Sequence, residues 1–460
     1  MERENKYMST IVAISTAPGN SGIGIVRLSG KNSINIVKKI FKPANNGEIK
    51  GYTIKYGNII DNKNEIIDEV LVSFFIAPKS YTGEEMCEIN SHGNNIVLKR
   101  ILNLCIENGA ELAEPGEFTK RAFINGRIDL LQAESVIDII NSKSELERKA
   151  AIKGLEGHLS KELKQIKAKI LDILTDVEAT IDYPEYDIEE RTNIEVLNEC
   201  KKISEELAKL EDSFERGKIL RDGVSVAIVG KPNAGKSSLL NKILKEERAI
   251  VTDIEGTTRD TIEEFVNIKG IPFKIIDTAG IRNADNEIEK IGIDKSKKAL
   301  SEADLVIAIC DITKELSEED FEILNSVKEK NSIILLNKKD LEEHILNESD
   351  FEEYSENILE VSIKENIGIE DIYEKMAEIF NVNELGTENT SIITNIRHKQ
   401  AIKSAKDSII KAIEVICEGM PVDITAIYFK QAIEEINKIT GENVTDDIIN
   451  EIFSKFCLGK

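Results

Sequence analysis

Four short motifs within one domain-sized interval constrain this 460-residue chain more than any other feature. GKPNAGKSS at 230–238 has the spacing of a glycine-rich loop that holds phosphates between a strand and a helix. It is followed by GTTRD at 256–260, DTAG at 277–280 and NKKD at 337–340. A single short motif of this kind is weak evidence, because it can occur by chance. Four of them in this order predict a guanine-nucleotide switch.

The loop that begins at Gly230 is expected to hold the phosphates of a nucleotide. Its backbone N–H groups and the N-terminus of the next helix would face the α- and β-phosphates. Lys236 would reach the β- and γ-phosphates and act in catalysis, and the Ser237 hydroxyl would ligate Mg²⁺. The loop residues predicted to contact GTP are Asn233, Ala234, Gly235, Lys236, Ser237 and Ser238.

The other three motifs supply the second metal ligand, the γ-phosphate sensor and the choice of base. Thr258 is the expected second Mg²⁺ ligand, Asp277 would lie beside the metal, and Gly280 can offer an N–H to the γ-phosphate. Asn337 and Asp340 would choose the base, because a carboxylate accepts from guanine N1–H and N2–H₂, which adenine lacks. GTP is therefore predicted over ATP. Further predicted GTP contacts are Thr252, Asp253, Ile254, Glu255, Gly256, Thr257, Thr278, Ala279 and Lys338.

Two assignments in this interval have alternatives. Ile281 follows DTAG where Ras-like GTPases keep a water-positioning Gln, so another group must orient the water. Glu289 in the following acidic stretch is the candidate, and a solvated helix position is the alternative. Ser362 lies either in a last base-contacting loop or at a strand end.

Composition narrows the class of protein. A chain of 460 residues is expected to form two or three domains, and 31% charged residues with no Trp favour a helix-rich protein. A net charge of −24 argues against a general nucleic-acid binder. Six scattered cysteines indicate neither a disulfide framework nor a zinc site. No apolar run approaches membrane-spanning length and no signal peptide is recognised, so a cytoplasmic protein is expected.

The patterns predict a multidomain α/β and α chain with four segments. Residues 1–118 carry short β-rich runs and one helix near 94–108, as in an α+β domain. Residues 119–216 repeat apolar residues at three- or four-residue steps, which is typical of an α-helical bundle. Residues 217–384 alternate strands and helices, as a mostly parallel sheet requires. Helical periodicity returns over 385–460, so the nucleotide domain is predicted to be inserted into one helical domain.

Stretches outside the nucleotide domain resemble the MnmE (TrmE) family of tRNA-modification GTPases, and the likeness covers residues 8–460. They are APGNSGIGIVRLSG at 17–30 with SYTGEE at 80–85, AEPGEFTKRAFINGRIDLLQAE at 113–134 and CLGK at 457–460. Two departures are His92-Gly93-Asn94 where the family usually has HGG, and Arg127 where many members have Lys.

The resemblance implies a folate-binding-like N-terminal domain that dimerises and holds 5-formyl-tetrahydrofolate or a related folate as one-carbon donor. The matching contacts are Arg27, Glu88, Arg127 and Lys460. Cys457 would be either a reactive thiol near that site or a packed apolar side chain.

The resemblance also implies that the G domains dimerise in a K⁺-dependent way. The matching K⁺ ligands are the Asn233 side chain and oxygens of Thr252, Ile254 and Thr257. A cation beside the phosphates would offset the charge of the transition state. Glu289 matches the family's catalytic Glu, which favours it over the solvated-helix alternative.

The function implied is GTP hydrolysis coupled to tRNA modification. A homodimer would join a flavin- and NADH-using partner resembling MnmG in a heterotetramer and install aminomethyl or carboxymethylaminomethyl groups at C5 of the wobble uridine. The basic run at 148–169 is read as a solvated helix face, so the partner would hold most of the tRNA. One alternative is a ribosome-assembly GTPase of the Era or EngA kind. The other is a stand-alone folate transferase with GTP as regulator.

Overall fold

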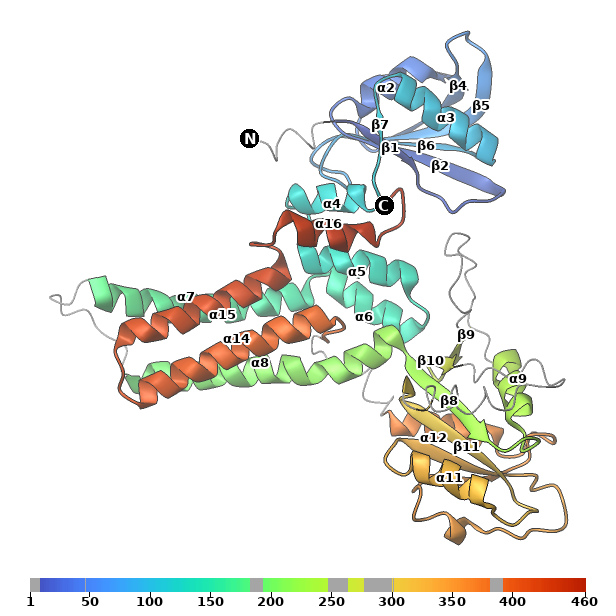
Figure 1. Cartoon of the computed structure of the whole chain (residues 1–460). Helices are drawn as coiled ribbons and strands as arrows, with labels where there is room; N and C mark the ends of the chain where they lie inside the picture. The colour runs from blue at the N-terminus through green and yellow to red at the C-terminus, as the bar shows by residue number, and fades with distance from the viewer. Residues whose placement is uncertain are drawn as a thin grey trace. The chain divides into compact units, whose positions relative to one another are not determined.

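The structure, a computed structural model, forms two compact units (Figure 1). The first unit comprises Met1–Ile137, Leu155–Ile188 and Pro421–Lys460, and the second comprises Asp138–Gly154 and Glu189–Met420. The residues that the structure describes are 9–45, 47–182, 193–246, 264–276, 300, 302–380 and 392–460.

A seven-stranded sheet in the order β3-β4-β5-β6-β2-β1-β7 lies in the first unit (Figure 1). Its neighbouring strands are antiparallel except for β1 and β7, which run parallel. Helices α2 (Ser33–Ile40) and α3 (Asn95–Glu107) share one apolar core with the sheet. The strands are β1 (Ile11–Ile14), β2 (Ser21–Ser29), β3 (Phe41–Pro43), β4 (Thr53–Ile60), β5 (Ile66–Phe75), β6 (Met86–Gly93) and β7 (Glu111–Leu112).

The two faces of this sheet differ because side chains alternate along a strand. On β2, Val26 and Leu28 are buried in the core with the two helices, so the side chain between them, Arg27, points to the opposite face. The register of β2 and β6 sets Arg27 directly opposite Glu88. The face away from the helices therefore carries a charged pair at its centre.

Among the described residues of the first unit, five further helices lie in the segments where the sequence predicts helices. They are α4 (Glu117–Ile124), α5 (Leu130–Asn141, which runs across the unit boundary), α7 (His158–Asp182), α15 (Val422–Thr440) and α16 (Asp446–Ser454). Helices α7 and α15 lie side by side. The buried positions of α7 recur at three- or four-residue steps, as predicted, and include Leu159, Leu163, Ile166, Ile170, Ile173 and Val177.

A six-stranded sheet in the order β13-β12-β11-β8-β10-β9 forms the core of the second unit. Every neighbouring pair is parallel except β9 and β10, which confirms the predicted mostly parallel sheet. The strands are β8 (Val224–Gly230), β9 (Glu264–Ile268), β10 (Ile271–Ile276), β11 (Leu305–Asp311), β12 (Ser332–Asn337) and β13 (Ile358–Val361). The helices are α6 (Glu145–Leu155), α8 (Asn193–Asp222), α9 (Lys236–Glu246), α11 (Glu318–Val327), α12 (Ile369–Ile379), α14 (Ile396–Cys417) and the 3₁₀ turn η1 (Glu348–Asp350).

Helices α8 and α14 flank the sheet in sequence and pack along each other. Lys406 pairs with Glu211 at 2.5 Å, and Lys399 pairs with Glu215 at 2.8 Å. Just before α14, the Ile393 backbone N–H donates to Ser213 Oγ at 3.1 Å. The chain therefore enters and leaves the nucleotide domain through two helices that touch.

Several expected elements are confirmed and two were missed. The helix near 94–108 is α3, and SIILLN is β12. Helix α2 was missed because SINIVKKI is short and rich in β-branched residues, which read as strand. Strand β9 was missed because it is a five-residue edge strand. Within the described ranges, no helix is both long and apolar enough to cross a membrane.

Candidate functional site

The phosphate loop connects the end of β8 to the start of α9 and depends on backbone conformations that suit glycine. Gly230 has φ +147° and Gly235 has φ +118°. A Cβ on Gly230 would clash with the Ile309 carbonyl oxygen, and one on Gly235 would clash with the Asn337 side chain. Asn233 also adopts left-handed backbone, at φ +62°. The loop is therefore tightly curled against β11 and β12.

Lys236 is the first residue of α9 and folds back over this loop. Its Nζ donates to the carbonyl oxygens of Gly230 at 2.5 Å and Lys231 at 2.7 Å. Burial lowers the pKa of Lys236, and the nearby charge of Glu319 partly opposes that shift. The ammonium lies at a helix N-terminus, which is where a phosphate would bind.

Asn337 ties the phosphate loop to the loop after β13. Its Nδ2 donates to the Ala234 carbonyl oxygen at 2.7 Å, and its Oδ1 accepts from the Ile363 backbone N–H at 3.1 Å. The residue is only 5% exposed. Asn337 therefore fixes the phosphate loop and the loop after β13 relative to each other.

Asp340 is exposed, and its carboxylate accepts a hydrogen bond from Ser362. Ser362 Oγ donates to Asp340 Oδ1 at 2.6 Å, and this hydrogen bond lowers the pKa of the Asp340 carboxyl. Asp340 is therefore an anion at neutral pH, as an acceptor for guanine N1–H must be. Ser362 directly follows β13, as the strand-end alternative expects, and its hydroxyl contacts Asp340; a contact of its loop with the base stays a prediction.

Lys338 lies between these residues in sequence and turns away from them. Its backbone is left-handed, at φ +75°, and its Nζ pairs with Asp311 at 2.5 Å. Burial raises the pKa of Asp311, but hydrogen bonds from Lys338 and Thr313 outweigh it and hold that pKa below its usual value.

The remaining predicted nucleotide residues lie outside the described residues. The structure thus brings together Asn233–Ser238 with 337–340, and the rest of the predicted site stays a prediction. Those untested positions are Thr252, Asp253, Ile254, Glu255, Gly256, Thr257, Thr258, Asp277, Thr278, Ala279, Gly280 and Glu289.

A second candidate site lies on the sheet of the first unit, around Arg27. Arg27 Nε pairs with Glu88 Oε1 at 2.8 Å, and the guanidinium also donates to the Gly459 carbonyl oxygen at 3.2 Å. The Arg27 guanidinium carbon lies 5.7 Å from the ring centroids of both Tyr81 and Phe118. Arg27 is therefore held by a carboxylate, two aromatic rings and the C-terminal tail.

The other two predicted folate residues join the same cluster. Arg127 donates to the Tyr81 carbonyl oxygen at 2.8 Å, and its guanidinium lies 5.0 Å from the Tyr81 ring centroid. Burial and then the charge of Arg27 lower the pKa of Lys460, with a smaller opposing contribution from Cys457. Two cationic side chains, Arg27 and Arg127, thus share the Tyr81 ring, which the sequence did not single out, and Lys460 lies close enough to Arg27 to feel its charge.

The C-terminal tail reaches this cluster because Gly459 fits closely against β1. Gly459 has φ +89°, and a Cβ there would lie 2.5 Å from the Ile14 carbonyl oxygen. Ser15 Oγ donates to the Gly459 carbonyl oxygen at 2.9 Å. Cys457 is exposed, so its interpretation as a packed apolar side chain is wrong.

The parallel sheet, the phosphate loop after β8 and the anionic Asp340 after β12 define a P-loop GTPase, a class of enzymes that bind and hydrolyse GTP. Two family models match the chain: the MnmE helical domain over residues 130–457 and the N-terminus of the GTP-binding protein TrmE over residues 10–127. The chain therefore belongs to the MnmE family, also called TrmE.

Two similar curated proteins carry the description tRNA modification GTPase MnmE. The one from Acetivibrio thermocellus is 49% identical over 454 residues, and the match covers 98% of this chain and 99% of the relative. The one from Thermoanaerobacter sp. (strain X514) is 49% identical over 457 residues, with the same coverage.

Among solved structures, the G domain of the T. maritima FeoB iron transporter is 24% identical with a TM-score of 0.26. That match covers 34% of this chain and 97% of the FeoB domain, and a likeness this low carries no inference. The near full-length relatives favour the modification GTPase over the ribosome-assembly alternative.

Proposed function

We propose that this GTP hydrolase works with a flavin-dependent partner resembling MnmG to install aminomethyl or carboxymethylaminomethyl groups at C5 of the wobble uridine in certain tRNAs. A folate such as 5-formyl-tetrahydrofolate would supply the one-carbon unit. The 49% identity to proteins described as tRNA modification GTPases supports the tRNA substrate. The six cysteines are free thiols, which fits the reducing cytoplasm where we place this reaction.

The observation that carries the folate proposal is the convergence of residues distant in sequence. Arg27 contacts Glu88 and the Gly459 backbone, and shares Tyr81 with Arg127. Cationic groups bind the carboxylates of a folate tail, and aromatic rings stack on its planar groups. This cluster offers both kinds of contact at one place on the sheet.

We propose that Lys236 and Glu289 are the catalytic residues of GTP hydrolysis. The contacts of Lys236 Nζ with the phosphate loop support its role beside the β- and γ-phosphates. Ser237 on the first turn of α9, with Thr258, would hold Mg²⁺, an ion that neutralises phosphate charge when bound. K⁺ would be held by Asn233, Thr252, Ile254 and Thr257. The exposed, left-handed Asn233 on this loop supports that assignment.

We propose that residues 217–384 form a G domain inserted into one helical domain, made of 119–216 and 385–460. The contact of α8 with α14 on either side of the insertion supports these boundaries. The N-terminal domain, 1–118, would form the homodimer. Its sheet presents the cross-strand pair Tyr56 and Leu71, which are 53% and 46% exposed. An apolar patch of this kind is typical of an interface.

Calorimetric titration of the full-length protein with 5-formyl-tetrahydrofolate tests the proposal. Arg27→Gln should weaken binding about tenfold or more, because it removes charge-assisted hydrogen bonds. Arg100→Gln is the matched control, since Arg100 also forms ion pairs with carboxylates but lies 40% exposed on α3. If the wild-type protein does not bind folate, the assignment of folate as the one-carbon donor is wrong.

The same protein, mixed with the flavoprotein, GTP, folate and unmodified tRNA, should yield modified wobble uridine detectable by mass spectrometry. Omitting either GTP or the flavoprotein should abolish the product. Folate turnover without the flavoprotein would instead support the stand-alone folate transferase.

A further inference from the structure

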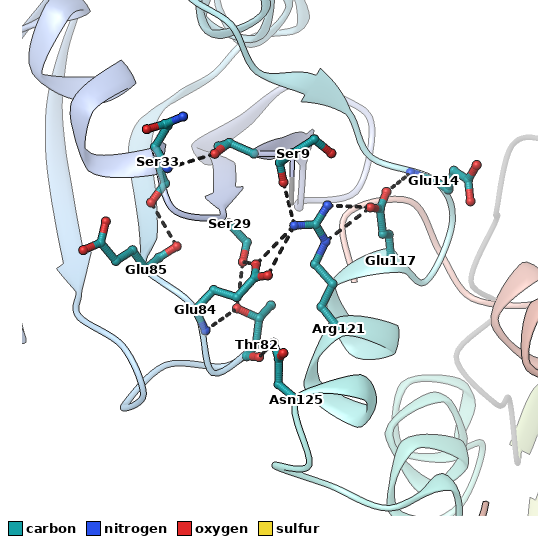
Figure 2. Close-up of polar contacts among 12 residues, drawn as sticks. Ser9, Ser29, Ser33, Thr82, Glu84, Glu85, Glu114, Glu117, Arg121 and Asn125 are labelled. Atoms are coloured by element: carbon teal, nitrogen blue, oxygen red, sulfur yellow. Dashed lines mark hydrogen bonds and ion pairs between the residues drawn. The ribbon is translucent and has the colours of Figure 1, made fainter. Parts of the chain in front are cut away.

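A buried arginine outside the predicted sites lies at the centre of the polar cluster that Figure 2 draws. Arg121 on α4 is only 1% exposed. Its guanidinium donates to Glu117 Oε1 at 2.8 Å, to Glu84 Oε2 at 3.2 Å and to the Ser9 carbonyl oxygen at 2.8 Å. One side chain therefore joins α4, the SYTGEE loop and the segment just before β1.

The SYTGEE loop is held at two further points beside Arg121 (Figure 2). Ser29 Oγ lies 2.7 Å from Thr82 Oγ1 and donates to Glu84 Oε2 at 2.7 Å. Asn125 Nδ2 donates to the Thr82 carbonyl oxygen at 2.7 Å. The loop is thus attached to the end of β2 and to the residue after α4.

Two carboxylates pair with the buried guanidinium. An unpaired buried charge is strongly unfavourable, and Glu84 and Glu117 compensate for this one. The forked shape of the guanidinium lets Nη1 bond Glu84 while Nη2 bonds Glu117. A lysine at position 121 would keep the charge but lose this fixed two-branched geometry.

Tyr81 precedes Thr82 in the SYTGEE loop, and its ring lies near the guanidinium groups of both Arg27 and Arg127. The Tyr81 hydroxyl lies 2.8 Å from Thr119 Oγ1, on α4 as well. Thus α4 holds Tyr81 by its hydroxyl and, through Arg121, holds the loop that follows it. Ser80 Oγ, on the other side of Tyr81, is buried and has no hydrogen-bond partner among the described residues.

We propose that Arg121 is a positioning residue that fixes the SYTGEE loop, and with it Tyr81, against Arg27 and Arg127 for ligand binding. This inference rests on the proposed folate site. Arg121 does not touch the ligand. It acts through Glu84 and the backbone of the loop, so its loss should change the position of the Tyr81 ring while the protein stays folded.

Full-length protein carrying 3-fluorotyrosine at position 81 tests this directly by ¹⁹F NMR, alongside calorimetry with 5-formyl-tetrahydrofolate. Arg121→Lys should shift or broaden the ¹⁹F signal and weaken folate binding about tenfold or more, as loss of a charge-assisted hydrogen bond predicts. The control Arg100→Lys replaces a surface arginine that also forms ion pairs with carboxylates and should change neither readout. If Arg121→Lys fails to fold, Glu84→Gln removes the same ion pair while its Ser29 contact remains.

The two readouts separate this inference from the proposed function. An unchanged ¹⁹F signal in a folded variant overturns the positioning role, and so does unchanged folate affinity in a protein that binds folate. If the wild type binds no folate, the donor assignment is wrong. The ¹⁹F signal then decides alone whether Arg121 fixes Tyr81, with a shift supporting the role and no shift overturning it.

Discussion

At the scale of single residues, the motifs identified the phosphate loop but not the side chains that hold the sites in place. Asn337 is predicted to contact the base, which stays a prediction, and the sequence did not show that its side chain also joins Ala234 and Ile363. Arg121 could not be inferred because its carboxylate from Glu84 lies 37 positions away in sequence. Spacing predicts local contacts such as the pair with Glu117, one helical turn away, but not contacts that the fold creates.

Asn233 allows a prediction at this scale about the proposed K⁺ site. GTP turnover in KCl should exceed turnover in NaCl at matched ionic strength, because a bound cation offsets charge that develops on the phosphates. Asn233→Ala should remove most of that difference, a loss of about tenfold. Asn366→Ala is the control, since Asn366 is also exposed and left-handed, at φ +60°. Equal wild-type rates in the two salts would rule out a K⁺-dependent step.

At the scale of elements, the apolar periodicity predicted where helices form but not which helices pack against each other. The spacing of apolar residues predicted α7, because the buried positions of a helix recur every three to four residues. Nothing in the sequence showed that α7 lies beside α15 and that α8 lies beside α14. The second of these pairings involves a close approach of Gly217 on α8 to the backbone of Ile393, just before α14.

Gly217→Ala should therefore destabilise the α8 and α14 pair. In an open helix, Gly→Ala gains up to about 1 kcal/mol. Here the new Cβ would clash with the Ile393 carbonyl oxygen, so we expect a net loss of about 1–3 kcal/mol. Chemical denaturation followed by circular dichroism would measure it. Gly22→Ala, at a glycine with open space around its Cβ position, should leave stability unchanged, and a stabilised Gly217→Ala would refute the close packing.

At the scale of the whole molecule, the fold class was predictable and the arrangement within the first unit was not. The alternation of strands and helices gave the parallel sheet, whose β12 has the bounds of SIILLN. In contrast, the C-terminal tail reaches Arg27 across 432 positions, through a fit at Gly459 that no local pattern encodes. The nucleotide and proposed folate sites thus lie on different sheets of one chain.

The central claim is that this chain is a GTP hydrolase whose Asp340 selects guanine. The most direct test compares turnover of GTP with turnover of xanthosine triphosphate, whose base has a carbonyl in place of the 2-amino group. Wild-type protein should prefer GTP. Asp340→Asn should reverse the preference by about 100-fold, because an amide donates where the carboxylate accepts. An Asp340→Asn variant that keeps the wild-type preference for GTP would contradict the account.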